Sequence, residues 1–198
     1  MGTLLNRRRY MGGGGSPAPQ YLMTKDTNPE VLAVCYAQHW CASPDYMTYE
    51  EAALVTSFPA SLFRFNTQIT HFEEIEYFGV TTIGNYCFQS ATKLTVLGNM
   101  PYLTSAGQGC FRQMSALTSI GTFPSLMTLP AEMFHNSTNI GYITLMQSSV
   151  PTISGQNCFP PNNCPIYVPD ELYDTYQAQT STYWNQVKSR ITKISEKP

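Results

Sequence analysis

The sequence predicts an α/β solenoid, in which short parallel strands stack coil on coil between helical N-terminal and C-terminal caps. Three observations predict this fold: phenylalanines recur at a nearly constant spacing, aliphatic columns keep the same register, and cap signals flank the repeating region. The phenylalanines are Phe63, Phe88, Phe111, Phe134 and Phe159. Their steps of 25, 23, 23 and 25 residues mark one equivalent position in successive units. A single unit cannot bury its own apolar face, so several units must stack.

Aliphatic residues repeat in the register of the phenylalanines. One column is Ile69, Leu94, Leu117 and Ile140. A second is Phe72, Leu97, Ile120 and Ile143, and a third is Val80, Leu103, Leu126 and Val150. The segments 94–97, 117–120 and 140–143 have the apolar spacing of the strand in leucine-rich repeats, and stacked coils would set them about 4.8 Å apart in a parallel sheet. We therefore expect a leucine-rich-repeat solenoid over residues 63–165, with the phenylalanines inside.

Helix signals before the repeats predict an N-terminal cap over residues 28–62. Asn28 and Pro29 form a typical helix start, because Asn caps the first turn and Pro fits its first position. A second helix is expected from Thr48, where Thr48 and Glu51 have the spacing of a capping box. We expect these two helices to close the first coil.

A C-terminal cap is expected over residues 166–198. Residues 166–168 (IYV) have the composition of a strand, and Asp170 is placed to cap a helix that follows. A final apolar set consists of Tyr183, Trp184, Val187 and Ile191. Together these segments would cover the last coil.

The repeat units resemble a known family. Residues 83–88 (IGNYCF) and 117–121 (LTSIG) are similar to BspA-type leucine-rich repeats of gut and oral bacteria, and residues 166–170 (IYVPD) are similar to the C-terminal end of such arrays. The segment 29–53 also resembles members of that group, so the resemblance covers residues 28–198. It implies a solenoid used for adhesion or protein interaction, often displayed on cell surfaces.

Composition argues against several classes of function. The formal charge is −2, of which Arg7, Arg8 and Arg9 supply +3, so the rest of the chain is mildly acidic and is not expected to bind nucleic acid. No run reaches the roughly 18 apolar residues of a membrane span, so no membrane insertion is expected. Glycines 12–15 stand where a signal peptide would need an apolar stretch, and we expect a protein made and folded inside a cell.

Residues 1–27 are predicted to form a flexible, basic and Gly-rich arm. The opening 5–11 (LNRRRYM) is similar to openings of phage and prophage structural proteins of gut bacteria, which implies an anchor in a larger assembly. The residues of this anchor would be Leu4, Leu5, Arg7, Arg8, Arg9, Tyr10 and Met11. A solvated tail remains an equal alternative, whereas three charges alone would bind nucleic acid only weakly.

The six cysteines invite a disulfide or metal interpretation. Cys87, Cys110 and Cys158 directly precede a repeated phenylalanine, at a position that also holds Leu62 and Met133. A position that accepts Leu, Met and Cys is an apolar core position, so we expect core packing. A bridge between Cys158 and Cys164 stays open, although a chain that folds inside a cell seldom keeps one.

Cys35, His39 and Cys41 form a small Cys/His cluster, with Asp45 as the nearest further ligand. A structural zinc site needs four ligands, and a Cys–His nucleophilic pair needs a pocket and an orienting third group. We expect Cys35 in the core, His39 on the surface, and neither metal nor cofactor here.

Glu73, Glu74 and Glu76 form an acidic run beside the first repeat strand. Neighbours on a strand point to opposite faces, so the run cannot supply a pair of facing carboxylates. We expect a solvated face.

These observations predict a non-enzymatic, protein-binding module that uses the outer wall of the strands. The candidate contact residues, which alternate with core positions, are Thr95, Val96, Thr118, Ser119, Tyr142 and Thr144. The expected setting is a phage virion, as a structural tail or surface-attached component made in the host cytoplasm, contacting virion neighbours or a host surface protein or glycan. The alternatives are a bacterial adhesin-like protein of the cell surface or cytoplasm, and a thiol enzyme or metal site at Cys35 and His39. Copy number, including a multimer within an assembly, stays open.

Overall fold

The computed structural model describes residues 21–198. The chain divides into two compact units, one ending at Ala52 and the other running from Ala53 to Pro198. The predicted anchor lies outside the described residues: Leu4, Leu5, Arg7, Arg8, Arg9, Tyr10 and Met11. In the part that is described, no helix has the length and apolar character needed to cross a membrane.

The first unit is a small α/β arrangement. Strand β1 (Tyr21–Thr24) pairs antiparallel with β2 (Tyr46–Thr48), and helix α1 (Pro29–Ala37) lies between them in sequence. Helix α2 (Tyr49–Leu54) follows β2 directly and crosses the boundary between the units. The buried side chains of this unit include Met23, Val31, Leu32, Cys35 and Met47. The β1–β2 pair was not predicted. That the unit closes the first coil stays a prediction.

Both predicted helix starts are found, with one difference. Helix α1 begins at Pro29, but the buried Asn28 side chain makes no capping hydrogen bond. The capping box is confirmed, since Glu51 N donates to Thr48 Oγ1 (3.2 Å) and Thr48 N donates to Glu51 Oε2 (2.8 Å). Partial burial alone would raise the pKa of Glu51, but hydrogen bonds from Thr48 and Ala42 outweigh it and lower the pKa.

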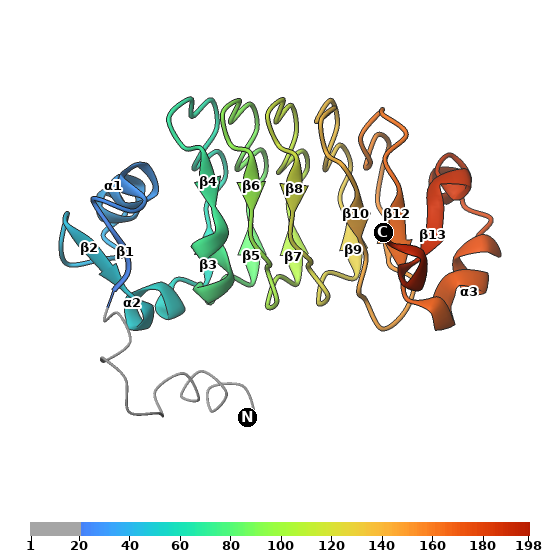
Figure 1. Ribbon diagram of the computed structural model, residues 1–198, viewed down its shortest axis with the longest axis horizontal. Coiled ribbons are helices and arrows are strands. Elements are labelled where there is room, and N and C mark those ends of the chain that lie inside the picture. The colour runs from blue at the N-terminus through green and yellow to red at the C-terminus, as the bar shows by residue number, and fades with distance from the viewer. Residues whose placement is uncertain (1–20) are drawn as a thin grey trace. The chain divides into compact units, whose positions relative to one another are not determined.

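The second unit is a row of coils with two short strands per coil (Figure 1). One parallel sheet contains β3 (Ser57–Phe58), β5 (Thr82–Ile83) and β7 (Ser105–Ala106). The next strands of this series, β9 (Thr128–Leu129) and β11 (Thr152–Ile153), form a separate parallel pair. The other contains β4 (His71–Phe72), β6 (Val96–Leu97) and β8 (Ser119–Ile120). A further parallel sheet contains β10 (Ile143–Thr144), β12 (Ile166–Val168) and β13 (Ile191–Lys193). Parallel stacking at the repeat period confirms the predicted fold class.

The strands differ from the prediction in two ways. One strand per coil was predicted, and the column that contains β3, β5 and β7 was not. Segments 94–97 and 117–120 end in β6 and β8, whereas segment 140–143 pairs forward with β12 and not back with β8. Gly141 N still donates to Thr118 O (3.1 Å), so the coil register persists across this break.

The repeated phenylalanines form one internal column, as predicted. Phe63, Phe88, Phe111 and Phe134 are at most 1% exposed, and Phe159 is 7% exposed. Neighbouring rings lie 4.8 Å (Phe63–Phe88), 5.6 Å (Phe88–Phe111) and 5.6 Å (Phe111–Phe134) apart between centroids. The aliphatic columns are also buried, except that Val150 is half-buried. Each ring therefore shields the next, which is the stacking that a solenoid needs.

The turns around the phenylalanine column have their own backbone ladder. The amide of each ring residue donates to the coil that follows: Phe63 N to Cys87 O (2.7 Å), Phe88 N to Cys110 O (2.8 Å), Phe111 N to Met133 O (3.0 Å) and Phe134 N to Cys158 O (2.9 Å). Left-handed backbone recurs two residues before each ring, at Ser61, Tyr86, Gly109, Glu132 and Asn157, and two residues after the first four rings, at Phe65, Ser90, Gln113 and Asn136. In these four coils the conformation turns the chain tightly twice.

The C-terminal region consists of short elements, not one long helix. They are η3 (Asp170–Leu172), α3 (Tyr173–Gln177), α4 (Thr182–Asn185), η4 (Lys188–Arg190), β13 and η5 (Ile194–Glu196). Trp184 is 2% exposed, its ring centroid lies 5.7 Å from that of Phe159, and its Nε1 donates to Pro151 O (3.1 Å). Trp184 therefore covers the last ring of the column.

One local prediction about charged residues was wrong, and another was confirmed only in part. Asp170 does not cap a helix: it begins a 3₁₀ turn, and its carboxylate accepts a hydrogen bond from Ser195 N (3.1 Å). The acidic run directly follows β4, as predicted, but it forms a 3₁₀ helix, η2 (Glu73–Tyr77), so the alternation of a strand does not apply to it. Glu73 is exposed as expected, whereas Glu74 and Glu76 are half-buried.

Candidate functional site

The predicted contact residues of the first coils lie on and beside the β4–β6–β8 sheet. Thr95 and Thr118 are exposed and directly precede β6 and β8. Their hydroxyls donate to the backbone of the preceding coil, from Thr95 Oγ1 to Thr70 O (2.8 Å) and from Thr118 Oγ1 to Thr95 O (3.1 Å). The threonine column is thus held in fixed positions by the main chain, which limits the entropy lost when a ligand binds it.

A second column runs along the same sheet. His71, Val96 and Ser119 are paired in register across β4, β6 and β8, and each is half-buried. His71 was not among the predicted contact residues, although Ile69 and Phe72 have the same apolar spacing as the core positions of the later strands. This sheet therefore presents two parallel columns of small, mainly polar side chains.

At the other end of the predicted surface, Lys197 contacts the predicted contact residue Tyr142. Tyr142 is 38% exposed, and its ring lies 5.8 Å from that of Tyr167 and 3.8 Å from Lys197 Nζ. Figure 1 shows the C-terminal end of the chain in front of β10 and β12, in agreement with this contact. The expectation that Thr144 faces solvent was wrong: Thr144 is 7% exposed and lies beside Tyr167, its partner on β12.

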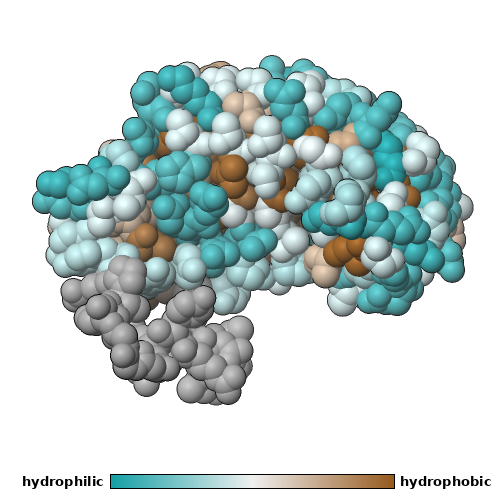
Figure 2. All heavy atoms as spheres, in the orientation of Figure 1, coloured by the Kyte–Doolittle hydropathy of each residue, from teal (hydrophilic) through white to brown (hydrophobic). Residues whose placement is uncertain are grey.

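The visible surface carries no large apolar area. In Figure 2 the same orientation shows mainly hydrophilic or neutral residues, with small, separate hydrophobic patches. Among the described residues seen in this view, no apolar area is as broad as those typical of obligate interfaces.

The cysteines of the repeats are core residues, as predicted. All six cysteines are free and buried, so Cys158 and Cys164 are not bridged. Burial raises the pKa of the Cys87 thiol to about 12, and it also raises the pKa values of the Cys110 and Cys158 thiols. A thiol that stays protonated is neither nucleophile nor metal ligand.

The Cys35 and His39 region does not form a shared site. Cys35 is fully buried in α1, whereas His39 is exposed and adopts a left-handed conformation after the helix. Burial, followed by the charge of Glu51, raises the pKa of Cys41. Within residues 21–198, no three His, Cys, Asp or Glu side chains are grouped closely enough to hold a metal ion.

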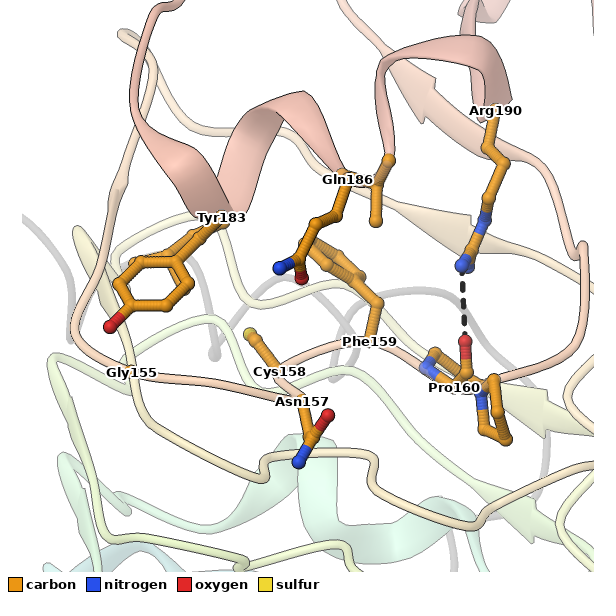
Figure 3. A pocket seen from close by; sticks show the side chains of 11 residues that line it. Gly155, Asn157, Cys158, Phe159, Pro160, Tyr183, Gln186 and Arg190 are labelled. Atoms are coloured by element: carbon orange, nitrogen blue, oxygen red, sulfur yellow. Dashed lines mark hydrogen bonds between the residues drawn. The ribbon is translucent and has the colours of Figure 1, made fainter.

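A cavity of about 180 Å³ lies between the last coil and the C-terminal helices (Figure 3). Cys158, Phe159 and Tyr183 line it, together with Arg190. The Arg190 guanidinium donates to Pro160 O and Cys164 O, both at 3.0 Å. Since these carbonyls hold the cation and the Cys158 thiol is protonated, the cavity is a packing feature with no reactive group poised in it.

A cluster that was not predicted from the sequence is formed by Arg64 and Phe65, on the turn between β3 and β4, and Tyr86, on the turn between β5 and β6. The Arg64 guanidinium carbon stands 4.7 Å from the Phe65 ring centroid and 5.5 Å from that of Tyr86, and Phe65 is 61% exposed. Arg64 and Tyr86 are 22 residues apart in the sequence. Their contact could therefore be predicted only by aligning the sequences of successive coils.

Comparison with protein families agrees with this architecture. The model of the BspA type leucine rich repeat region matches residues 39–166 in six copies. No match was found among curated proteins. Leucine-rich repeats are typically non-enzymatic modules of protein interaction, which fits a surface of stacked strand positions without a reactive cleft. With most of its length covered by these six copies, the chain belongs to the family of BspA-type leucine-rich-repeat proteins.

Proposed function

We propose that this chain binds a protein partner through the outer face of the β4–β6–β8 sheet. The observation that carries this proposal is the register of the sheet: three coils present equivalent positions side by side. Four of the predicted contact residues lie there, namely Thr95, Val96, Thr118 and Ser119. His71 extends the surface to the first coil.

The chemistry of this face favours an extended partner segment. The Thr95 and Thr118 hydroxyls already donate to carbonyls, so they offer lone pairs to donors on a partner. Val96 supplies a small apolar contact between them. Spaced polar positions with one apolar site suit a strand or loop that crosses successive coils.

The test is a triple variant with a matched control. Thr95→Arg, Thr118→Arg and Ser119→Arg together should weaken binding of a partner recovered with the wild-type chain by at least about 100-fold, because three long cations occlude the face. The control is Thr81→Arg, Thr104→Arg and Ser105→Arg on the β3–β5–β7 sheet. Thr81 and Thr104 make the same hydroxyl-to-carbonyl contacts there, to Thr56 O (3.2 Å) and Thr81 O (3.1 Å).

The dissociation constant measured by calorimetry separates the outcomes. Loss of affinity in the first triple variant alone supports the proposal. An unchanged affinity there, or an equal loss in the control, refutes it. Circular dichroism melting of all three proteins checks that the coils remain folded.

We further propose a phage virion as the setting, with the chain as a tail or surface-attached component. Its support is the similarity of residues 5–11 to phage structural proteins, a segment outside the described residues. The alternative, an adhesin-like protein of the bacterial surface, has equal support from the repeats. Mass spectrometry of purified virions decides: peptides of this chain in virions support the first, and peptides released only by protease treatment of intact cells support the second.

A further inference from the structure

Arg64, Phe65 and Tyr86 form a compact cluster, here termed the turn cluster. The Arg64 guanidinium stacks over both rings, at 4.7 and 5.5 Å from their centroids. Arg64 is exposed and takes part in no ion pair within residues 21–198. The turn cluster thus combines an unneutralised planar cation with an exposed ring.

The repeat supplies an internal comparison for this cation. Two coils later, Arg112 stands at the position of Arg64, directly after a column phenylalanine, and Glu132 stands at the position of Tyr86. Arg112 Nη1 pairs with Glu132 Oε2 at 2.7 Å. The same geometry therefore neutralises one arginine with a carboxylate and leaves the other with aromatic neighbours. A carboxylate from outside can complete the Arg64 site as Glu132 completes the Arg112 site.

The backbone of the turn cluster adopts the left-handed conformation of the repeat turns. Phe65 (φ 59°) and Tyr86 (φ 57°) both adopt left-handed backbone, which bulky side chains rarely do. Tyr86 is accommodated because the next coil has Gly109 at the equivalent position, where a Cβ would stand 2.7 Å from the Tyr86 ring. The same left-handed conformation recurs at the equivalent positions of the other coils, so the repeat itself sets the orientation of these side chains.

We propose that the turn cluster binds a partner-protein segment in which an acidic side chain is next to an apolar one. The carboxylate pairs with the Arg64 guanidinium, and the apolar neighbour packs on the exposed Phe65 ring. Arginine is suited to this role because its planar fork can engage a carboxylate while its face stays on the rings. The choice of an acidic partner rests on charge complementarity with this unpaired cation. The site is separate from the β4–β6–β8 face, so either can fail without the other.

The experiment is an NMR titration of the ¹⁵N-labelled full chain with the capped peptide acetyl-Glu-Phe-Glu-Phe-amide. We expect saturable shifts of the Phe65 and Tyr86 amides and of Arg64 Nε–H. The capped peptide acetyl-Gln-Phe-Gln-Phe-amide should bind at least about tenfold more weakly, because it lacks the charge.

Three variants test the assignment. Arg64→Gln should weaken binding of the acidic peptide about tenfold. Tyr86→Glu should do the same by recreating the Arg112–Glu132 pair inside the chain, in a backbone conformation that Glu132 already adopts (φ 57°). Lys93→Gln, which removes an exposed cation elsewhere, is the control and should leave binding unchanged.

Equal binding of the two peptides, an unchanged affinity of Arg64→Gln, or no saturable shift at about 10 mM peptide would overturn the proposal. An unchanged affinity of Tyr86→Glu would also do so, since an internal carboxylate must compete with an external one. Loss of binding in Lys93→Gln would mean that only net charge is being sensed.

Discussion

The β4–β6–β8 and β10–β12–β13 sheets are built by the same repeat but present different surfaces. In the first, the positions outside the core are exposed or half-buried, as at Thr95 and Ser119. In the second, Tyr142 and Tyr167 lie beneath Lys197, and Thr144 is buried. The difference does not come from the coil register, which continues from Thr118 to Gly141. At Tyr142 and Tyr167 it comes from Lys197, whose Nζ lies over both rings. Thr144 occupies the repeat position of Gly98 and Gly121 and pairs with Tyr167 on β12.

This contrast shows that a repeat pattern predicts the inner wall better than the outer one. The inner wall is fixed by stacking of identical positions, whereas the outer wall is free to be covered by whatever follows the repeats. A partner that needs the strand face is therefore offered the first coils and not the last. The following predictions test the shared core first and the covering segment afterwards.

The largest effect is expected at the core beneath both sheets. Phe111→Ala removes a fully buried ring that stacks between Phe88 and Phe134. We expect a loss of about 3–5 kcal/mol in the free energy of unfolding, measured by urea denaturation. An unchanged midpoint would mean that the ring is not interior.

A smaller effect is expected where the C-terminal cover meets the last coil. Trp184→Phe keeps a ring beside Phe159 but removes the Nε1–H that donates to Pro151 O. A buried carbonyl without its donor should cost about 1–3 kcal/mol, read from the same denaturation curves. Equal stability of variant and wild type would show that this hydrogen bond does not hold the cover in place.

The contact of Lys197, near the C-terminus, with the rings of Tyr142 and Tyr167 should contribute less to stability than the Trp184 hydrogen bond. Lys197→Ala removes a cation 3.8 Å from the Tyr142 ring, which we expect to cost about 0.5–1 kcal/mol. The variant should also speed nitration of Tyr142 in the native state. Lys93→Ala is the control, because Lys93 is exposed and outside this sheet. An unchanged nitration rate of Tyr142 in Lys197→Ala would show that Lys197 does not protect this ring.

The smallest effect is expected at the hydrogen bond between Ser195, near the C-terminus, and Asp170. Hydrogen bonds from Ser195 lower the pKa of Asp170 below the ordinary value of an aspartate. The contact therefore stabilises the folded state above the unfolded pKa, and its contribution is lost as the pH falls through the folded pKa. Exchange of the Ser195 amide should quicken, relative to distant amides, as the pH is lowered from 5 through the acidic range. Asp170→Asn should show no such pH dependence.

The sequence predicted the fold because its evidence repeats. The phenylalanine column, the cysteine positions beside it and the capping box of Thr48 and Glu51 all depend on local or periodic chemistry, and the structure confirms them. The second strand of each coil was missed because two residues, such as Thr82 and Ile83, make a strand only through pairing with neighbouring coils.

Three features of the surface could not be predicted from local pattern. Thr144 was expected outside because it follows the core residue Ile143, but its pairing with Tyr167 on β12 leaves it buried. Asp170 resembled a helix cap, but its carboxylate found a donor 25 residues away at Ser195. The turn cluster could be recognised only by comparing Arg64 with Arg112 and Tyr86 with Glu132. That comparison requires the register of the coils, which the structure supplies.

Thiol labelling of two single substitutions tests the central contrast most directly, because all six native cysteines are buried. Thr95→Cys places a new thiol on the open sheet, and Thr144→Cys places one on the covered sheet, at the repeat position that Gly98 and Gly121 hold in the preceding coils. The prediction is that a maleimide modifies the thiol of Thr95→Cys under native conditions, while Thr144→Cys and the wild-type chain stay unmodified until denatured. Equal native modification of the two variants would contradict the account.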